Sequence, residues 1–236
     1  ATPLPYQVYL QAVTAGYPPL PTATPSPLPT KPPAGSNGLA YVNYYRSTAH
    51  LPGVTDEPAW SSGDKLHARY SVKNDVLLNT EDPANDWYTA AGASNQIGSW
   101  DVTASDEWAV DTWMTTVFHA VGILDPGLRQ VGYSAYRESD DRLQMAAGLD
   151  VIRGLGSVPA GVSFPIKWPG DGMTVPLRQH NGETPSPLTS CPGYATPSGL
   201  PVLLIFGDGG PAPVVTGHSF AQCGTPLEHC VFDGTT

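Results

Sequence analysis

The segment from Ser105 to Tyr133 constrains the fold of this chain more than any other stretch. It begins with Ser105, Asp106 and Glu107, and acidic side chains in the first turn of a helix are stabilised by the helix dipole. The helical segment ends in a Leu-Asp-Pro turn, and a strand begins near Val131. A helix that leads directly into a strand is typical of domains in which helices and a sheet pack in layers.

The elements on either side of this segment predict an α+β domain over residues 36–158. Residues 39–49 have the apolar spacing of a short helix, and a second helix follows for which Asp56 is the expected cap. Strands are predicted around Gln130–Tyr136 and Leu143–Val151. Helices that precede paired strands in the sequence indicate that the helices cover a sheet.

Residues 1–35 have the sequence of an extended arm. Side chains over residues 4–13 alternate with a period of two, which predicts a strand. Residues 18–33 are rich in proline and predict a polyproline spacer, which at about 3.1 Å per residue reaches roughly 50 Å. Two interpretations stay open: the strand packs on its own domain, with the arm as a tether to a cell envelope, or it adds to the sheet of a neighbouring copy. In the second interpretation the contacts come from Tyr6, Val8, Tyr9 and Leu10.

Residues 159–236 differ in composition from the domain before them. Pro, Gly and Thr are frequent, and no helical period is present. Short strands are expected at Leu200–Phe206 and Val214–Phe220. This part of the chain is predicted to be a small β-rich extension.

Three cysteines lie in this extension: Cys191, Cys223 and Cys230. A bridge between Cys191 and Cys230 would stabilise the extension by about 4 kcal/mol in the chain-entropy model, whereas Cys223–Cys230 would close a shorter loop and contribute less. We favour the first pairing, which leaves Cys223 as a buried free thiol or linked to another chain. Clustered cysteines in a chain rich in Pro, Ser and Thr indicate an oxidising, extracellular compartment.

The charge of the chain excludes one class of partner. Its net charge is −10, with only 11 Lys and Arg residues spread along the sequence, and binding to nucleic-acid phosphates needs clustered basic side chains. No apolar run approaches the roughly 20 residues that span a bilayer. The sequence therefore predicts neither a nucleic-acid partner nor a transmembrane segment.

Short motifs occur in a characteristic order over residues 37–152. They are Asn43-Tyr44-Tyr45-Arg46, Leu51-Pro52-Gly53-Val54, His67-Ala68-Arg69-Tyr70, Thr80-Glu81-Asp82-Pro83, Trp87-Tyr88-Thr89, Trp113-Met114, Phe118-His119 and Leu124-Asp125-Pro126. Together they resemble the CAP superfamily of secreted proteins (cysteine-rich secretory proteins, antigen 5 and pathogenesis-related 1 proteins). The resemblance implies an α-β-α sandwich, and residues 168–172 and 199–202 look like the tail of bacterial members.

The resemblance also implies a cleft, because many members carry two His and two Glu that often bind a divalent metal. Here Asn79 stands at the expected first His, Ala91 at a Glu, and Thr116 near the second Glu. Only His119 matches. An amide, a methyl group and a hydroxyl are poor replacements for metal ligands, so the departures argue against metal binding and the chemistry that depends on it.

The residues that remain candidates for a ligand cleft are His67, Glu81, Trp87 and His119. His67 and His119 are the weak candidates for a divalent metal, with Glu81 as the carboxylate beside them. The alternative is that His67 bonds within the helix packing and His119 closes the C-terminal end of its helix. Trp60, Trp108 and Trp113 are expected in the core. No Ser-His-Asp motif supports a catalytic triad, and no catalytic residue is assigned.

These observations favour a secreted, non-catalytic module that self-associates at the cell surface through its arm. The alternatives are a secreted binding protein whose cleft takes a lipid, glycan or peptide, and a metal-assisted hydrolase built on His67, Glu81 and His119.

Overall fold

The computed structural model describes residues 28–92, 95–140, 142–207 and 215–232. The strand predicted over residues 4–13, with its contact side chains Tyr6, Val8, Tyr9 and Leu10, lies outside the described residues and stays a prediction.

A four-stranded sheet forms the centre of the molecule. Its strands are β1 (Thr55–Asp56), β2 (Asn95–Ser99), β3 (Gln130–Arg137) and β4 (Met145–Asp150). They are arranged in the order β1-β3-β4-β2, with β1 parallel to β3 and the other neighbours antiparallel. The two strands predicted from the sequence are thereby confirmed as β3 and β4, with small differences at their ends.

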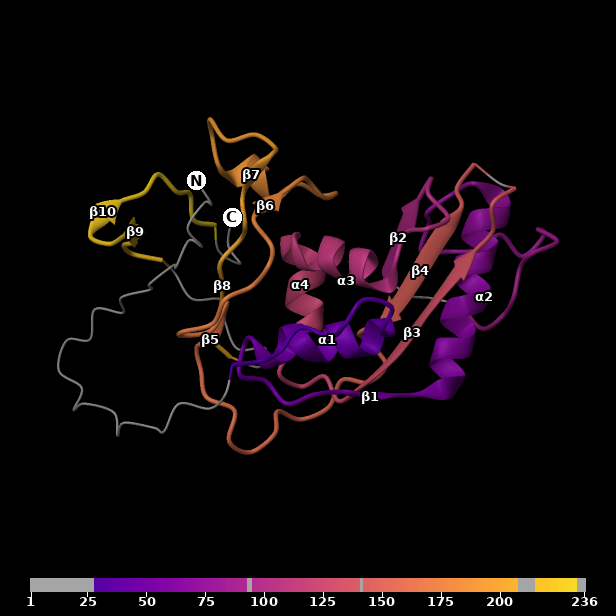
Figure 1. Ribbon diagram of the computed structural model, residues 1–236, viewed down its shortest axis with the longest axis horizontal. Coiled ribbons are helices and arrows are strands. Elements are labelled where there is room, and N and C mark those ends of the chain that lie inside the picture. The colour runs from indigo at the N-terminus through magenta and orange to yellow at the C-terminus, as the bar shows by residue number, and fades with distance from the viewer. Residues whose placement is uncertain (1–27, 93–94, 141, 208–214, 233–236) are drawn as a thin grey trace.

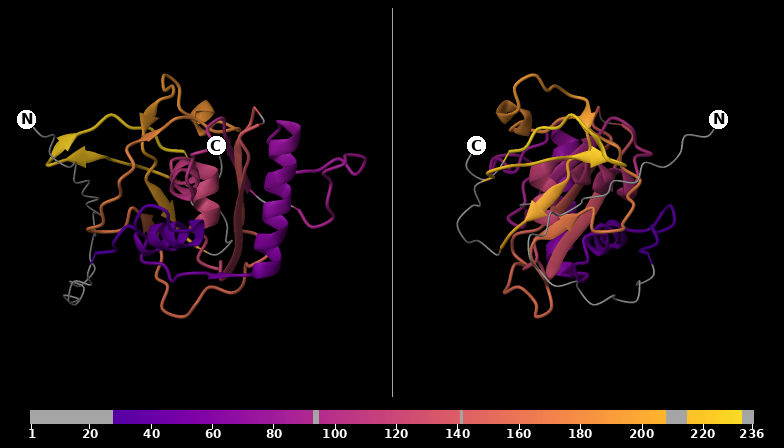
Figure 2. Two further views of the ribbon diagram at one scale, coloured as in Figure 1. Left: turned by 45° about the vertical axis from the view of Figure 1, so that its right-hand side comes forward. Right: turned by 90° about the vertical axis from the view of Figure 1, so that its left-hand side faces the viewer.

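Helices cover both faces of this sheet. They are α1 (Gly38–Ser47), α2 (Pro58–Asn74), α3 (Asp106–Met114) and α4 (Val117–Ile123). Helix α2 packs on one face against β3 and β4, while α1, α3 and α4 form the layer on the other side (Figures 1 and 2). The α+β class is confirmed, and the described residues have the three layers of an α-β-α sandwich.

The helices predicted to start near Ser105 and Asp56 are present, with one difference in the capping residue. Ser105 caps α3, because its hydroxyl accepts a hydrogen bond from the Trp108 amide at 3.0 Å. The expected cap of α2 was Asp56, but the cap is Glu57. Asp56 still belongs to β1 and accepts a hydrogen bond from the Ser61 hydroxyl.

The sequence predicts one continuous helix from Ser105 to beyond His119, but this prediction is wrong. The helix that begins at Ser105 stops at Met114, and α4 starts at Val117. Between them, the hydroxyls of Thr115 and Thr116 donate to main-chain carbonyls three residues earlier, each at 2.7 Å, and such bonds compete with helix continuation. His119 therefore lies in the first turn of α4 and not near a helix C-terminus, so the expected role there is wrong.

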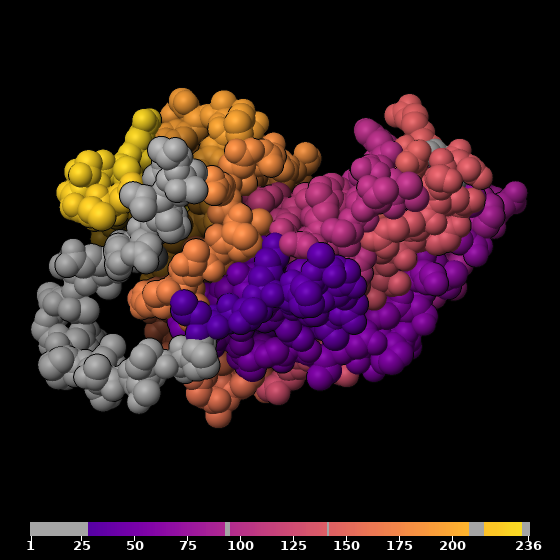
Figure 3. Space-filling view, viewed as in Figure 1, coloured from indigo at the N-terminus to yellow at the C-terminus, as the bar shows by residue number. Residues whose placement is uncertain are grey.

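The core combines residues from the sheet domain and from the extension. Trp113 and Trp168 are both 1% exposed, and the Trp168 indole donates to the Thr48 hydroxyl at 3.1 Å. The expectation of a core position is wrong for Trp108, which is 37% exposed, and for Trp60, whose ring is only partly buried under the Arg153 guanidinium. Because Trp168 joins the main core, the extension packs as part of the same body (Figure 3).

The extension consists of short strands and one helical turn. The strands pair as β5 (Ile166–Trp168) with β8 (Leu203–Ile205), β6 (Gln179–His180) with β7 (Ser198–Gly199), and β9 (Ala221–Gln222) with β10 (Thr225–Pro226). A 3₁₀-helix covers Pro187–Ser190. The strand predicted at Leu200–Phe206 is present in shortened form as β8, whereas residues 215–220 of the other predicted strand are not in a strand.

The disulfide predicted between Cys191 and Cys230 is confirmed. Cys223 is a free thiol, as that pairing requires, but it is exposed rather than buried. It occupies a tight turn with a backbone φ of 48°, so its side chain lies at the tip of the β9–β10 hairpin.

Candidate functional site

His67 and Glu81, two of the predicted cleft residues, form a closed pair. The His67 Nδ1 lies 2.7 Å from the Glu81 Oε1, and the two side chains are 0% and 3% exposed. The other ring nitrogen, Nε2, donates to the Leu78 carbonyl oxygen at 2.9 Å, since a carbonyl can only accept. Both nitrogens of His67 are therefore engaged with protein acceptors, and neither can bind a ligand unless one of these contacts breaks.

The loop between α2 and β2 closes over this pair. The second Glu81 oxygen accepts a hydrogen bond from the Thr89 amide at 2.7 Å. A Cβ atom added at Gly92 would lie 2.8 Å from Glu81 Oε1 and 3.0 Å from His67 Nδ1, so the backbone passes directly over the two side chains. The pair holds the loop against α2, which agrees with the packing interpretation of His67.

Trp87 lies on the same loop but contacts the outer surface of α2. Its ring is covered by the Arg69 guanidinium, 4.6 Å from the ring centre, and by the Lys73 ammonium group at 5.4 Å. These are cation–π contacts, each of about 0.5–1 kcal/mol at an exposed site. Trp87 thus supports the loop from outside.

His119 does not join His67 and Glu81. It lies on α4, in the helical layer on the opposite side of the sheet from α2 (Figure 1). The structure therefore separates the predicted four-residue cleft into two places. The pair of His67 and Glu81 is internal, whereas the His119 side chain is 30% exposed.

The partner of His119 comes from the extension and was missed by sequence reasoning. His119 Nδ1 lies 2.9 Å from the Thr116 hydroxyl and 3.6 Å from a carboxylate oxygen of Glu183. The Thr116 hydroxyl donates its hydrogen to the Trp113 carbonyl, so it accepts from Nδ1–H. No described residue provides a partner for the Nε2 of His119, which is the nitrogen left with a lone pair.

Glu183 docks the extension onto the start of α4. Its carboxylate accepts hydrogen bonds from the main-chain amides of Val117 at 2.5 Å and Phe118 at 3.0 Å, and its side chain is 2% exposed. Burial alone would raise the pKa of Glu183, but the nearby His119 ring and the hydrogen bonds from these two amides outweigh burial and lower the pKa. His180 adds a second contact by donating from Nδ1 to the Thr115 carbonyl at 2.9 Å.

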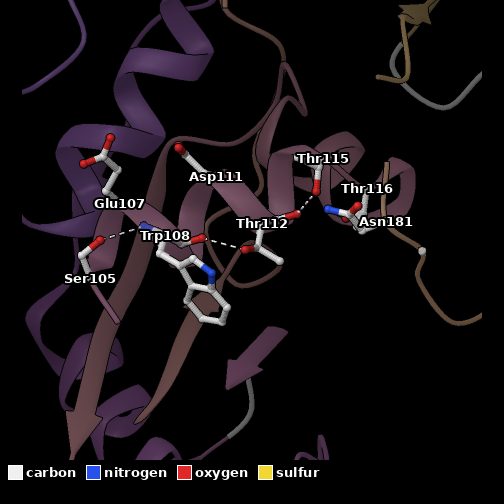
Figure 4. Close-up of a pocket in the computed structure, with 9 residues that line it drawn as sticks. Ser105, Glu107, Trp108, Asp111, Thr112, Thr115, Thr116 and Asn181 are labelled. Carbon is white, nitrogen blue, oxygen red and sulfur yellow. Dashed lines mark hydrogen bonds between the residues drawn. The ribbon is translucent and has the colours of Figure 1, made fainter. Parts of the chain in front are cut away.

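A groove of about 430 Å³ runs beside this contact, between α3 and the docked segment (Figure 4). The exposed ring of Trp108 lies at one end of it beside Thr112, and the amide of Asn181 lies beside Thr116 at the other end. Its lining residues are Ser105, Glu107, Trp108, Asp111, Thr112, Thr115, Thr116, Asn181 and Gly182. The groove thus combines hydroxyl, amide and carboxylate side chains with one large aromatic surface.

The acidic end of the groove holds Lys31, from the end of the proline-rich segment. Its ammonium group lies 2.7 Å from Glu107 and 2.9 Å from Asp111, and the Tyr45 hydroxyl donates to the same Asp111 at 2.6 Å. Burial lowers the pKa of Lys31, but the bonds to Glu107 and Asp111 outweigh it and raise the pKa. The Tyr41 hydroxyl donates to the Pro33 carbonyl at 2.8 Å, so residues 31–33 are held on α1 and α3.

Within residues 28–92, 95–140, 142–207 and 215–232, no three His, Cys, Asp or Glu side chains are grouped so as to hold one metal ion. None of the helices in the described part of the chain has the length and apolarity needed to cross a bilayer.

Comparison with known proteins places the sheet domain in a family. Residues 39–147 match the family model described as "CAP: Cysteine-rich secretory protein family". No curated protein matches the chain. The matched segment begins in α1 and ends in β4, so it includes the His67–Glu81 pair and His119 but none of the extension that supplies Glu183.

Proposed function

Residues 39–147 form a CAP domain, and from this premise we propose that the protein is an extracellular, non-catalytic CAP module that self-associates through its N-terminal arm. The Cys191–Cys230 disulfide supports an oxidising, extracellular location. A tether to the cell surface is compatible with the same arm.

The non-catalytic part of the proposal is supported by the residues that replace the family's cleft set. Asn79, Ala91 and Thr116 stand where ligand side chains are expected. Within the described residues, His67 and Glu81 are buried under the α2–β2 loop, and His119 lies apart from them. A hydrolase that combines His67, Glu81 and His119 in one centre would need these elements to rearrange, which counts against that alternative.

The observation that carries the self-association proposal is the attachment of Lys31 to Glu107 and Asp111. A charge held by two carboxylates and partly shielded from water fixes one end of the proline-rich segment on the domain. Proline-rich chain is semi-rigid and extends by about 3.1 Å per residue. A stiff spacer that is anchored at one end can hold the predicted strand at residues 4–13 away from its own domain. The strand is then available to add to the sheet of a neighbouring copy.

Deletion of residues 1–20 tests this proposal. We expect the intact chain to form assemblies that electron microscopy and analytical ultracentrifugation detect, and the deleted chain to be a monomer of unchanged fold. The control is Cys223→Ser in the intact chain, because the exposed thiol could also join copies. Unchanged assembly after the deletion, or an intact chain that is a monomer at all concentrations, would contradict the proposal.

The groove beside Trp108 favours a second candidate function, the binding of a glycan. Sugars stack on aromatic rings and bond to hydroxyl, amide and carboxylate groups, and the groove presents all of these. Trp108 fluorescence titrated with an N-acetylglucosamine tetramer should then change, and Trp108→Ala should abolish binding. The matched variant Trp87→Ala should bind the tetramer as the parent does. If Trp108→Ala binds it equally well, this groove is excluded as the glycan site.

A further inference from the structure

The hairpin of β9 and β10 brings two histidines together. Its turn consists of Cys223 and Gly224, which both have positive φ, 48° and 82°, as the turn favoured in two-residue hairpins requires. The pairing continues beyond the strands, since the Leu227 amide donates to the Phe220 carbonyl at 2.8 Å. Extending the same register by two more residues on each side puts His218 opposite His229.

The two imidazole rings meet in a T-shaped contact at this position. His218 Nδ1 lies 2.8 Å from His229 Nε2, and the ring planes are at 84°. His229 Nδ1 donates to the Leu227 carbonyl at 2.8 Å, because a carbonyl can only accept. In the neutral pair, His229 Nε2 therefore carries a lone pair, and it accepts the Nδ1 hydrogen of His218.

The surroundings hold His229 firmly and leave His218 open to solvent. The Phe220 ring packs against His229 with 5.8 Å between ring centres. The next residue, Cys230, is fixed by its disulfide to Cys191. His229 is half-buried, whereas His218 is exposed, so a solute can reach the two facing nitrogens from the His218 side.

We propose that His218 Nδ1 and His229 Nε2 form a two-histidine site for a divalent transition-metal ion, Cu²⁺ above all. Imidazole nitrogens bind such ions at about 2.0 Å, so two of them at neighbouring corners of a square plane are about 2.8 Å apart. The observed separation of 2.8 Å equals this spacing. Because the two nitrogens face each other through a hydrogen bond, both rings must turn for their lone pairs to point at the ion. Square-planar coordination is typical of Cu²⁺, which also binds nitrogen ligands most tightly among the common divalent ions.

Proton balance presents no obstacle. Binding needs a lone pair on His218 Nδ1, and the neutral ring provides one when its hydrogen moves to Nε2, with no net release of a proton. The bond from His229 Nδ1 to the Leu227 carbonyl is the outer-shell contact that metal-binding histidines usually make, and it keeps the ring oriented. Water would complete the coordination.

Calorimetry of the full chain with CuCl₂ tests the site, in a Cys223→Ser background that removes the competing thiol. We expect one Cu²⁺ per chain and an electron paramagnetic resonance spectrum with nitrogen ligation. Loss of an outer-shell partner typically lowers metal affinity by about 10- to 100-fold. His218→Ala and His229→Ala each remove a direct ligand, so each should lower the Cu²⁺ affinity by at least this factor. Both variants should keep the parent's circular dichroism spectrum, because the hairpin is held by its disulfide.

Two control histidines separate this site from others. His50→Asn replaces an exposed histidine with a residue that tolerates its positive φ of 57°, and His119→Ala removes the remaining histidine of the family cleft. Both should bind Cu²⁺ as the parent does. The proposal would be overturned if His218→Ala and His229→Ala bind Cu²⁺ as tightly as the parent. It would also be overturned if the parent shows no binding up to about 1 mM CuCl₂, because its dissociation constant would then be above about 1 mM.

Discussion

Two histidine–carboxylate pairs on opposite sides of the sheet have different architectures. His67 and Glu81 are separated by one loop of sequence, are almost fully buried and engage every ring nitrogen and carboxylate oxygen with the protein. His119 and Glu183 belong to different parts of the chain, and the histidine is 30% exposed with a longer separation of 3.6 Å. The first pair closes a loop, whereas the second borders a groove.

The difference shows that residue type does not decide role in this domain. Burial and the number of engaged atoms make His67 structural, because an unpaired charge in the interior costs several kcal/mol. Exposure and a ring nitrogen without a partner in the described residues make His119 accessible to solutes.

Glu81→Ala should cause the largest loss of stability. It removes the partner of a buried histidine and the acceptor of the Thr89 amide. Breaking one side of a buried pair typically costs about 3–5 kcal/mol, so the free energy of unfolding in urea should fall by about this amount. A loss below about 1 kcal/mol would mean that the pair does not hold the loop.

Glu183→Ala should have a smaller effect, confined to the docking of the extension. The carboxylate accepts two main-chain hydrogen bonds at the start of α4, and a hydrogen bond to a charged group contributes about 1.5–3 kcal/mol. We expect a loss of about 2 kcal/mol and faster hydrogen exchange at the Val117 and Phe118 amides. Unchanged exchange at these two amides would contradict the docking role.

Acidification should reproduce part of the Glu183 effect. A carboxylate whose folded pKa is lowered adds stability that is fully present above its unfolded pKa, about 4.3, and is lost as the pH falls through the lower folded value. Chemical denaturation should therefore show that the free energy of unfolding falls less between pH 6 and about pH 3 in Glu183→Gln than in the parent. Parallel profiles for the two proteins would exclude the contribution.

His119→Ala should have the smallest effect on stability. Its side chain is partly exposed and its carboxylate partner keeps two main-chain donors, and exposed ion pairs contribute about 0–1 kcal/mol. Thermal unfolding should shift by only a few degrees. A loss as large as that of Glu81→Ala would show that the two pairs are alike.

Much of the scaffold could be predicted from the sequence, because its signals are local. Ser105 caps a helix through an amide three residues away, and the apolar pattern around β3 and β4 is visible without tertiary information. The Cys191–Cys230 pairing was preferred on loop entropy and is present.

The parts that could not be predicted depend on contacts distant in sequence. Glu183 reaches α4 from the extension, and Lys31 reaches α3 from the proline-rich segment. No periodicity or motif marks either residue. The break between α3 and α4 was missed because it depends on the hydroxyl bonds of Thr115 and Thr116 rather than on a proline or glycine.

Histidine modification in the native protein tests the contrast between the two pairs most directly. Diethyl pyrocarbonate reacts with an accessible ring nitrogen that carries a lone pair, and mass spectrometry locates the product. We predict rapid modification of His119 in the folded chain and modification of His67 only after unfolding. Modification of His67 at the rate of His119 would contradict the account, since it would mean that the loop over Glu81 leaves the pair open.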